Sequence, residues 1–276
     1  MNRSALTIII CIAFLSLAAF SQPLTASQLP TKEQFAPLLS GAPCDDKDRF
    51  EAVKNLFVEA GAPEDAITVD KHKSVDNLMV TKKGLTDEIL VLGAHYDKIG
   101  GGCGVIDNWS GIVILSEIYR AVRELKSQKT ILFVAFGKEE LGLVGSSKMV
   151  SAIGKKELPK YCAMVNFDSF GRAVPQALAN VSSKKMIELA ESVSEEMKIP
   201  FGKAGIDLAS SDSASFQKRN IPAITLHGLG EGWENIIHSK KDTMESVDLL
   251  SVYLGFRHGL VMLSRIDAAS CEAFRK

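Results

Sequence analysis

Histidine and carboxylate side chains recur in this sequence at points where apolar runs end or a helix is expected to begin. The residues placed in this way are His95, Asp97, Asp107, Glu139, Glu140, Asp168 and His238. Imidazole nitrogen and carboxylate oxygen are both ligands that zinc accepts. Because the carboxyl ends of parallel strands meet at one edge of an open sheet, side chains that follow several such strands are expected to converge there. The set therefore predicts a metal site.

Each of these residues also has a simpler explanation when it is taken alone. A histidine after a strand is more often packed or exposed than bound to a metal. Asp107 stands where a helix cap is expected, and the pair Glu139 and Glu140 suits the positive end of a helix. Asp168 suits a turn. The metal-site hypothesis therefore rests on the whole set and not on any single member.

Other site chemistries have less support in the sequence. The glycine-rich turn at residues 100–104 lacks the third glycine of a dinucleotide-binding fingerprint, and there is no G-K-[ST] phosphate loop. The nucleophile motif G-x-S-x-G and the zinc motif H-E-x-x-H are absent as well. The 32 basic residues are balanced by 33 acidic ones, so no basic excess indicates a nucleic-acid partner.

The elements that must position these side chains alternate along the chain. Helices are expected at 45–60, 108–125, 141–152, 184–197 and 246–266, and strands at 76–81, 88–93, 130–136, 161–167 and 221–226. The strands are continuous apolar runs, which is typical of a mainly parallel sheet covered by helices on both faces. We therefore expect an α/β fold, a three-layer sandwich with a mainly parallel mixed sheet. Residues 22–42 are interpreted as an N-terminal lead-in and residues 43–276 as a single catalytic domain.

The first residues have the pattern of a secretory signal peptide. Arg3 precedes an apolar and uncharged run at 5–20, and small residues follow at a possible cleavage site. The run is shorter than the roughly 20 residues of a spanning helix. We therefore expect residues 1–21 to be a cleaved signal and the protein to be secreted or periplasmic, without stable membrane association after cleavage. The alternative is an uncleaved N-terminal anchor.

Four cysteines follow this segment, namely Cys44, Cys103, Cys162 and Cys271. In an oxidising compartment they permit two disulfides in any of three pairings, which the sequence cannot separate. Buried free thiols are the alternative. Because no two of these cysteines form a C-x-x-C pair, a thiolate zinc site is not expected.

Five segments of the sequence resemble the successive motifs of one known family. They are His95-Tyr96-Asp97, Asp107-Asn108-Trp109-Ser110-Gly111, Glu139-Glu140-Leu141-Gly142-Leu143-Val144-Gly145-Ser146, Asn166-Phe167-Asp168 and His238-Ser239-Lys240-Lys241-Asp242-Thr243. In this order they resemble the two-zinc secreted aminopeptidases, typified by bacterial leucyl aminopeptidase and related to glutamate carboxypeptidase and glutaminyl cyclase. The resemblance implies the zinc-exopeptidase (phosphorylase/hydrolase-like) architecture. It also implies a metallo-aminopeptidase that takes peptide substrates with a free N-terminus.

Carried over position by position, the resemblance implies two Zn²⁺ ions per chain with Asp107 bridging them. His95 and Asp168 would complete the ligands of one ion, and Glu140 and His238 those of the other. Three carboxylates and two zinc ions sum to a net charge of +1, which is favourable for binding hydroxide.

The resemblance also assigns two residues to the reaction itself. Glu139 is the implied general base, which takes a proton from water and delivers it to the departing amine. Asp97 would accept the other ring N–H of His95 and so fix the tautomer of that imidazole. The family further implies a cis peptide bond between Asp107 and Asn108.

Some positions depart from the family pattern. The substrate-side motif, commonly Ser-Asp-His, reads Ser-Asp-Ser at residues 211–213. Asp212 remains a substrate-binding candidate, with a helix cap as the alternative. His227 is a candidate for polarising the substrate carbonyl, with an ordinary loop residue as the alternative. Trp109 is bulkier than the small residue usual at its position.

Other functions of the same fold remain open. They are glutaminyl-peptide cyclisation on one zinc ion, dipeptidase or carboxypeptidase activity, and a metal-free binding module. Asn108 and the intact motif that follows the paired glutamates favour a peptidase over a cyclase.

Overall fold

A computed structural model describes residues 29–205 and 210–275 of the chain. The expected signal peptide, residues 1–21, lies outside these described residues, as does the beginning of the expected lead-in. Within the described ranges, no helix combines the length and the apolar character that crossing a membrane requires.

A single mixed sheet forms the centre of the described fold, with the strand order β1-β2-β4-β3-β5-β8-β6-β7. Its members are β1 (Ile67–His72), β2 (Val75–Lys82), β3 (Ile89–His95), β4 (Thr130–Phe136), β5 (Tyr161–Phe167), β6 (Gln176–Leu178), β7 (Gly202–Ala204) and β8 (Ala223–His227). The four central strands β4, β3, β5 and β8 run parallel to one another. The outer pairs β1–β2, β2–β4 and β6–β8 are antiparallel. The expected mainly parallel mixed sheet is confirmed.

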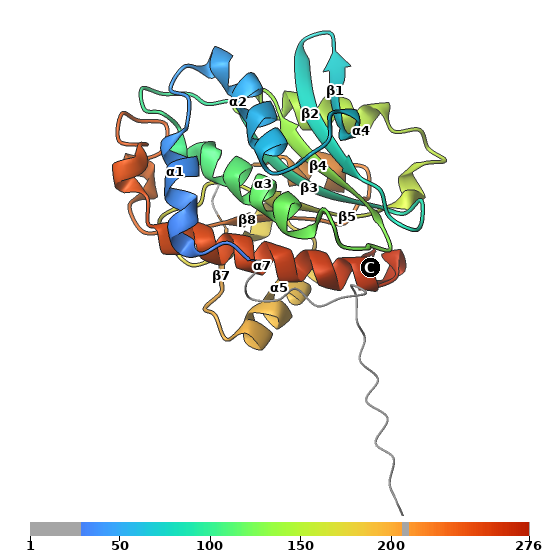
Figure 1. The fold of residues 1–276 in the computed structure, drawn as a ribbon. Coiled ribbons are helices and arrows are strands. Elements are labelled where there is room, and N and C mark those ends of the chain that lie inside the picture. Colours follow the sequence, from blue (N-terminus) through green and yellow to red (C-terminus); the bar gives the residue numbers. More distant parts are fainter. Residues whose placement is uncertain (1–28, 206–209, 276) are drawn as a thin grey trace, which may run out of the picture.

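Helices cover both faces of this sheet (Figure 1). They are α1 (Phe35–Ser40), α2 (Asp46–Glu59), α3 (Ser110–Val122), α4 (Val144–Ala152), α5 (Lys184–Met197), α6 (Ser213–Gln217) and α7 (Leu249–Ala268). On β3, Leu90 and Leu92 pack into the larger core with α1, α2, α3, α5 and α7, whereas Val91 points into a second core with α4 and α6. Because both faces are buried, the central strands are apolar at successive positions and do not alternate.

The N-terminal residues contribute to this core. Phe35 and Leu39 of α1 are completely buried, and the ring of Phe35 lies against Phe256 with centroids 5.4 Å apart. Asp45 caps the start of helix α2, because its carboxylate accepts the N–H of Lys47 and so satisfies one of the free donors of the first turn. The part of the lead-in that the structure describes is therefore packed onto the domain.

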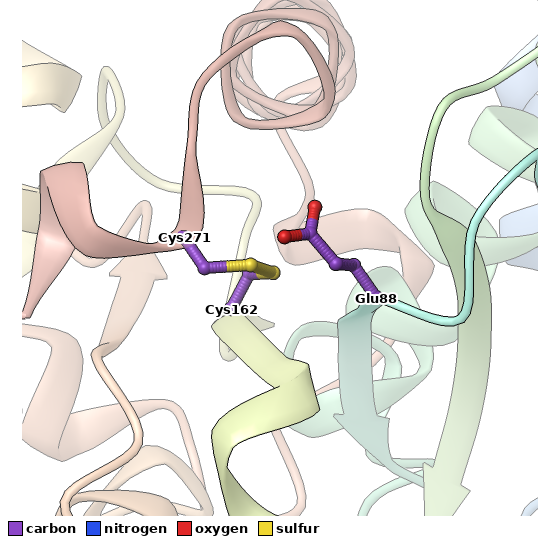
Figure 2. Close-up of side chains that lie close together, drawn as sticks. All are labelled: Glu88, Cys162 and Cys271. Carbon is purple, nitrogen blue, oxygen red and sulfur yellow. A yellow bond between two sulfur atoms is a disulfide. The ribbon is translucent and has the colours of Figure 1, made fainter.

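The four cysteines of the described chain form two disulfides, Cys44–Cys103 and Cys162–Cys271. This pairing answers the question that the sequence left open. Glu88 lies close to the second disulfide (Figure 2), so the three residues resemble a cluster of metal ligands. Metal ions bind thiolates, and sulfur atoms already bonded to one another do not offer that ligand. We therefore interpret this cluster as structural.

Candidate active site

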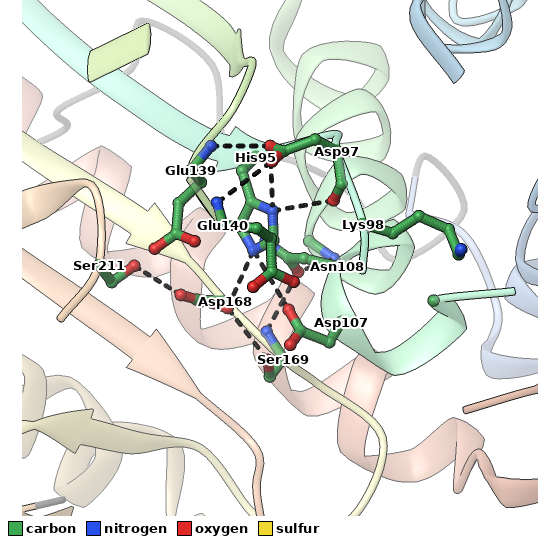
Figure 3. A network of polar contacts seen from close by, with 12 residues as sticks. His95, Asp97, Lys98, Asp107, Asn108, Glu139, Glu140, Asp168, Ser169 and Ser211 are labelled. Carbon is green, nitrogen blue, oxygen red and sulfur yellow. Dashed lines mark hydrogen bonds and ion pairs between the residues drawn. The ribbon is translucent and has the colours of Figure 1, made fainter. Parts of the chain in front are cut away.

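The seven residues predicted as metal ligands or catalytic groups meet at the carboxyl edge of the parallel strands (Figure 3 labels all of them except His238). His95 ends β3, the two glutamates follow β4, and Asp168 follows β5. Asp107 comes from the loop before α3, and His238 comes from the loop before α7. Together with apolar side chains, six of the seven line a cavity of about 340 Å³. Asp97, the seventh, lies beside the cavity and is buried.

Asp107 lies between two groups of side chains. Its Oδ1 atom is 3.2 Å from Nε2 of His95, and that nitrogen is 3.5 Å from Oδ1 of Asp168. Its Oδ2 atom is 2.9 Å from Nε2 of His238, and that nitrogen is 3.2 Å from Oε2 of Glu140. Each oxygen of one carboxylate thus faces its own pair of one imidazole and one carboxylate.

The chemistry of these five residues fits divalent cations. Asp107 and His95 are almost completely buried, and Oε1 of Glu140 is buried without a hydrogen-bond partner among the described residues. Burying several carboxylates together is costly unless cations or hydrogen bonds compensate their charge. His95, Asp107 and Glu140 also present ligand atoms within 4.8 Å of one another. These residues could therefore hold metal ions.

The loop that carries Asp107 is held by the loop that carries His238. The carboxylate of Asp242 accepts the main-chain N–H groups of Ile106, at 2.7 Å, and Asp107, at 3.1 Å. The glycine-rich turn allows the two loops to approach closely, because a Cβ at Gly102 would lie 2.5 Å from the carbonyl oxygen of Ser239. The peptide bond between Asp107 and Asn108 is cis, as the family resemblance implied.

Asp97 contacts His95 in a different way from the one expected. Nδ1 of His95 lies 3.1 Å from the main-chain oxygen of Asp97 and 3.6 Å from its carboxylate. The carbonyl is therefore the nearer acceptor for the ring N–H. The Asp97 carboxylate instead accepts the main-chain N–H groups of Glu139, at 2.9 Å, and Glu140, at 3.1 Å (Figure 3). Asp97 thus positions the turn that carries both glutamates.

Asp168 is oriented by hydroxyl groups. Its Oδ2 accepts a hydrogen bond of 2.5 Å from Ser211, and its Oδ1 accepts one of 3.0 Å from Ser169. Ser211 in turn accepts a hydrogen bond of 2.7 Å from the amide of Asn166. Each oxygen of Asp168 therefore accepts a hydrogen bond from a hydroxyl group, and Oδ1 is also the atom that lies 3.5 Å from Nε2 of His95.

The charged groups of the site shift one another's pKa. Hydrogen bonds to Asp107 and Glu140 raise the pKa of His238 to about 10, so a metal ion that binds this nitrogen at neutral pH displaces a proton. Burial by itself would raise the pKa of Asp107, but hydrogen bonds from His238 and His95 outweigh burial and lower it. Burial raises the pKa of Glu139 well above its ordinary value. Such a carboxyl group is suited to taking up and releasing a proton.

The two substrate-binding candidates lie in different surroundings. His227 lines the cavity, and its Nδ1 accepts the N–H of Leu229, so Nε2 carries the proton of the neutral ring. Burial lowers its pKa to about 4 and keeps it neutral. Asp212 is completely buried, its carboxylate does not cap α6, and it is not among the residues that line the cavity. The structure therefore places His227, and not Asp212, in the wall of the cavity.

Two further residues support the site, and sequence reasoning did not single them out. Asp242 belongs to the last motif, but nothing in the sequence indicated that its carboxylate would reach main-chain groups beside Asp107. Arg49 lies in α2, a helix expected only to pack against the sheet, and its side chain is completely buried near the site loops. Arg49 also accounts for the bulky residue at position 109, because its guanidinium carbon lies 5.1 Å from the centroid of the Trp109 ring.

The chain is similar in sequence to known aminopeptidases. The sequence is 26% identical over 256 residues to leucine aminopeptidase 2 of Arthroderma otae, a match that covers 80% of this chain and 51% of that protein. The chain thus spans about half the length of this curated relative.

Solved structures show the same fold. A zinc aminopeptidase from Bacillus subtilis matches with a TM-score of 0.61 and 26% identity, over 72% of this chain and 52% of that one. A glutaminyl cyclase from an Acidobacteriales bacterium matches with a TM-score of 0.71 over 90% of this chain and 99% of that one. At 16% identity, this second likeness shows the fold alone. The sequence model of peptidase family M28 matches residues 77–253, which include all seven predicted metal-binding and catalytic residues. The chain therefore belongs to peptidase family M28.

Proposed function

We propose that this chain is a zinc-dependent aminopeptidase that removes the N-terminal residue of peptides. Membership of a peptidase family supports hydrolysis of a peptide bond. The observation that carries the proposal is the position of Asp107, whose two oxygens face separate pairs of one imidazole and one carboxylate. This arrangement provides for two metal ions that share one carboxylate.

In this proposal, His95, Asp107 and Asp168 would hold one zinc ion, and Asp107, Glu140 and His238 would hold the other. Zinc, when bound, supplies Lewis-acid chemistry that acidifies water and polarises a carbonyl group. The ligand types are those that zinc prefers. The hydrogen bonds from Ser211 and Ser169 to Asp168 keep that carboxylate in the orientation that binding needs.

Glu139 is the proposed general base. Its main chain is held by Asp97, and its side chain lines the cavity. Among the described residues, the ion pairs of His95 and His238 are with other carboxylates and not with Glu139. Its carboxylate accepts a proton from the attacking water and then donates that proton to the departing amine nitrogen. Its burial favours the protonated form between these two steps.

The cavity wall indicates the class of substrate. Leu178, Leu229, Trp233 and Ile237 line one part of it, so an apolar first side chain gains free energy by burial there. His227 presents a neutral ring whose Nε2–H has no partner among the described residues. We assign this N–H to an oxygen of the substrate, since a buried donor without an acceptor is costly.

An extracytoplasmic location is part of the proposal. Two disulfides join the four described cysteines, and such bonds persist mainly in oxidising compartments. The apolar segment that precedes the described residues is consistent with export.

A panel of substrates tests the function. We expect cleavage of leucyl and phenylalanyl amides and peptides, no cleavage of the same peptides with an acetylated N-terminus, and loss of activity with a zinc chelator. Equal cleavage of acetylated peptides would contradict an aminopeptidase. Including a peptide with N-terminal glutamine tests the second candidate, a glutaminyl cyclase, which is the activity named for one solved structure of the same fold. Ring closure without hydrolysis would support the cyclase.

A further inference from the structure

Arg49 of α2 is a buried cation whose hydrogen bonds, among the described residues, go only to main-chain oxygens. Its side chain is completely buried. The guanidinium donates to the carbonyl of Tyr96, to that of Pro43 at 3.1 Å, and to those of Cys103 at 2.9 Å and Gly104 at 3.3 Å. These acceptors belong to three separate segments of the chain, which this one side chain joins.

Two of these segments carry proposed metal ligands. Tyr96 stands between His95 and Asp97 just after β3, whereas Cys103 and Gly104 lie four and three residues before Asp107. The guanidinium is a rigid planar fork, so donors on its different nitrogens fix the distance between the groups that accept from them. Arg49 therefore sets how far the end of β3 lies from the loop of Asp107.

Two other contacts join the same N-terminal segment to the same loop. The Cys44–Cys103 disulfide is one, and a hydrogen bond of 3.0 Å from the indole N–H of Trp109 to the carbonyl of Leu38 is the other. All these contacts begin in residues 38–49, which lie outside the segment that the family description matches. These contacts hold the loop of Asp107 from a part of the chain that the family match does not include.

We propose that Arg49 is a positioning residue that sets the separation of His95 and Asp107 and thereby the zinc affinity of the site. The proposal rests on the metal centre described under the proposed function. Its hydrogen bonds constrain the geometry of the site, because among the described residues they go to main-chain carbonyls and none goes to a carboxylate. Its positive charge also acts on Asp107, so a variant that keeps the charge is needed to separate the two effects. A lysine keeps the charge but carries a single nitrogen, which cannot span the same carbonyls.

The test compares Arg49→Met and Arg49→Lys with a matched control, Lys129→Met. Lys129 is also a buried cation, 2% exposed, and it donates to the carbonyls of Asp267 at 3.0 Å and Ala269 at 2.6 Å. It precedes β4 and so lies at the edge of the parallel strands opposite the site. Losing it should lower the melting temperature without affecting the metal.

Zinc affinity of the full chain is measured by competition with a chromophoric chelator, and coordination geometry by the visible spectrum of the cobalt-substituted protein. Removing a residue that orients metal ligands typically weakens binding about 10- to 100-fold. We expect a loss in this range for Arg49→Met, a smaller loss for Arg49→Lys and a changed cobalt spectrum in both. Lys129→Met should keep the affinity and spectrum of the unsubstituted protein.

Unchanged zinc affinity and cobalt spectrum in the Arg49 variants would overturn the positioning role, whatever their melting temperatures. If Arg49→Met does not fold, Arg49→Lys decides the question by the same criteria. Absence of zinc binding in the unsubstituted chain would contradict the proposed function itself, so the two failures are distinguishable.

Discussion

Replacing Glu139 by glutamine is expected to lower kcat by at least about a hundredfold, because general acid–base catalysis typically contributes 10²–10⁴-fold. Glutamine keeps the size of the side chain but cannot take up the proton. The zinc content should stay unchanged, because the Glu139 carboxylate is not among the contacts of the two imidazoles. Steady-state kinetics and metal analysis of the purified variant check both parts.

The adjacent residue supplies the matched control. Glu140→Gln makes the same chemical change one position later, but Oε2 of Glu140 lies 3.2 Å from Nε2 of His238. This variant should lose zinc as well as activity. Near-normal turnover in Glu139→Gln, or zinc loss in that variant equal to the loss in Glu140→Gln, would contradict the role assigned to Glu139.

Replacing Asp107 by asparagine should have the largest effect on metal binding. The Asp107 carboxylate faces both groups of ligands, so its loss should weaken the binding of both proposed zinc ions. Asp168→Asn, in contrast, removes a ligand from only one of them. We expect Asp107→Asn to retain less than about one zinc ion per chain under conditions where the unsubstituted protein holds two, and to lose at least about a thousandfold in kcat/KM, since the metal pair supplies most of the chemistry.

Asp267→Asn controls for loss of a buried carboxylate. Asp267 accepts the N–H groups of Gln128 at 3.0 Å and Lys129 at 2.7 Å, at the edge of the sheet away from the site. This variant should be less stable but should bind the normal amount of zinc. If Asp107→Asn kept both ions while Asp168→Asn lost them, Asp107 would not be the shared ligand.

The central elements of the fold could be predicted because their residues are buried on both sides. The bounds of β4, β5 and α5 agree with the expected ones, since apolar runs or a clear helical period define them. The short strands β6 and β7 and the edge strand β1 were not predicted. On β1 most residues are exposed or half-buried and polar, so the strand depends on pairing with β2 and leaves no apolar pattern in the sequence.

The site could be predicted as a set because its members follow strands that are easy to identify. His95 ends β3, Asp168 directly follows β5 and Glu140 comes four residues after β4, so the topology brings them together at one edge of the sheet. Contacts between distant loops could not be predicted in this way. Asp242 and Arg49 act on main-chain groups far away in sequence, and a main-chain acceptor has no residue type that a sequence pattern could reveal.

The sharing of Asp107 between two ions is tested most directly by locating zinc in crystals of the full chain through its anomalous scattering. We expect two peaks of comparable height about 3.5–4 Å apart, the separation usual for paired metal ions, one beside His95 and Asp168 and the other beside Glu140 and His238. A single peak at full zinc occupancy, or two peaks of which only one lies against Asp107, would contradict the shared carboxylate.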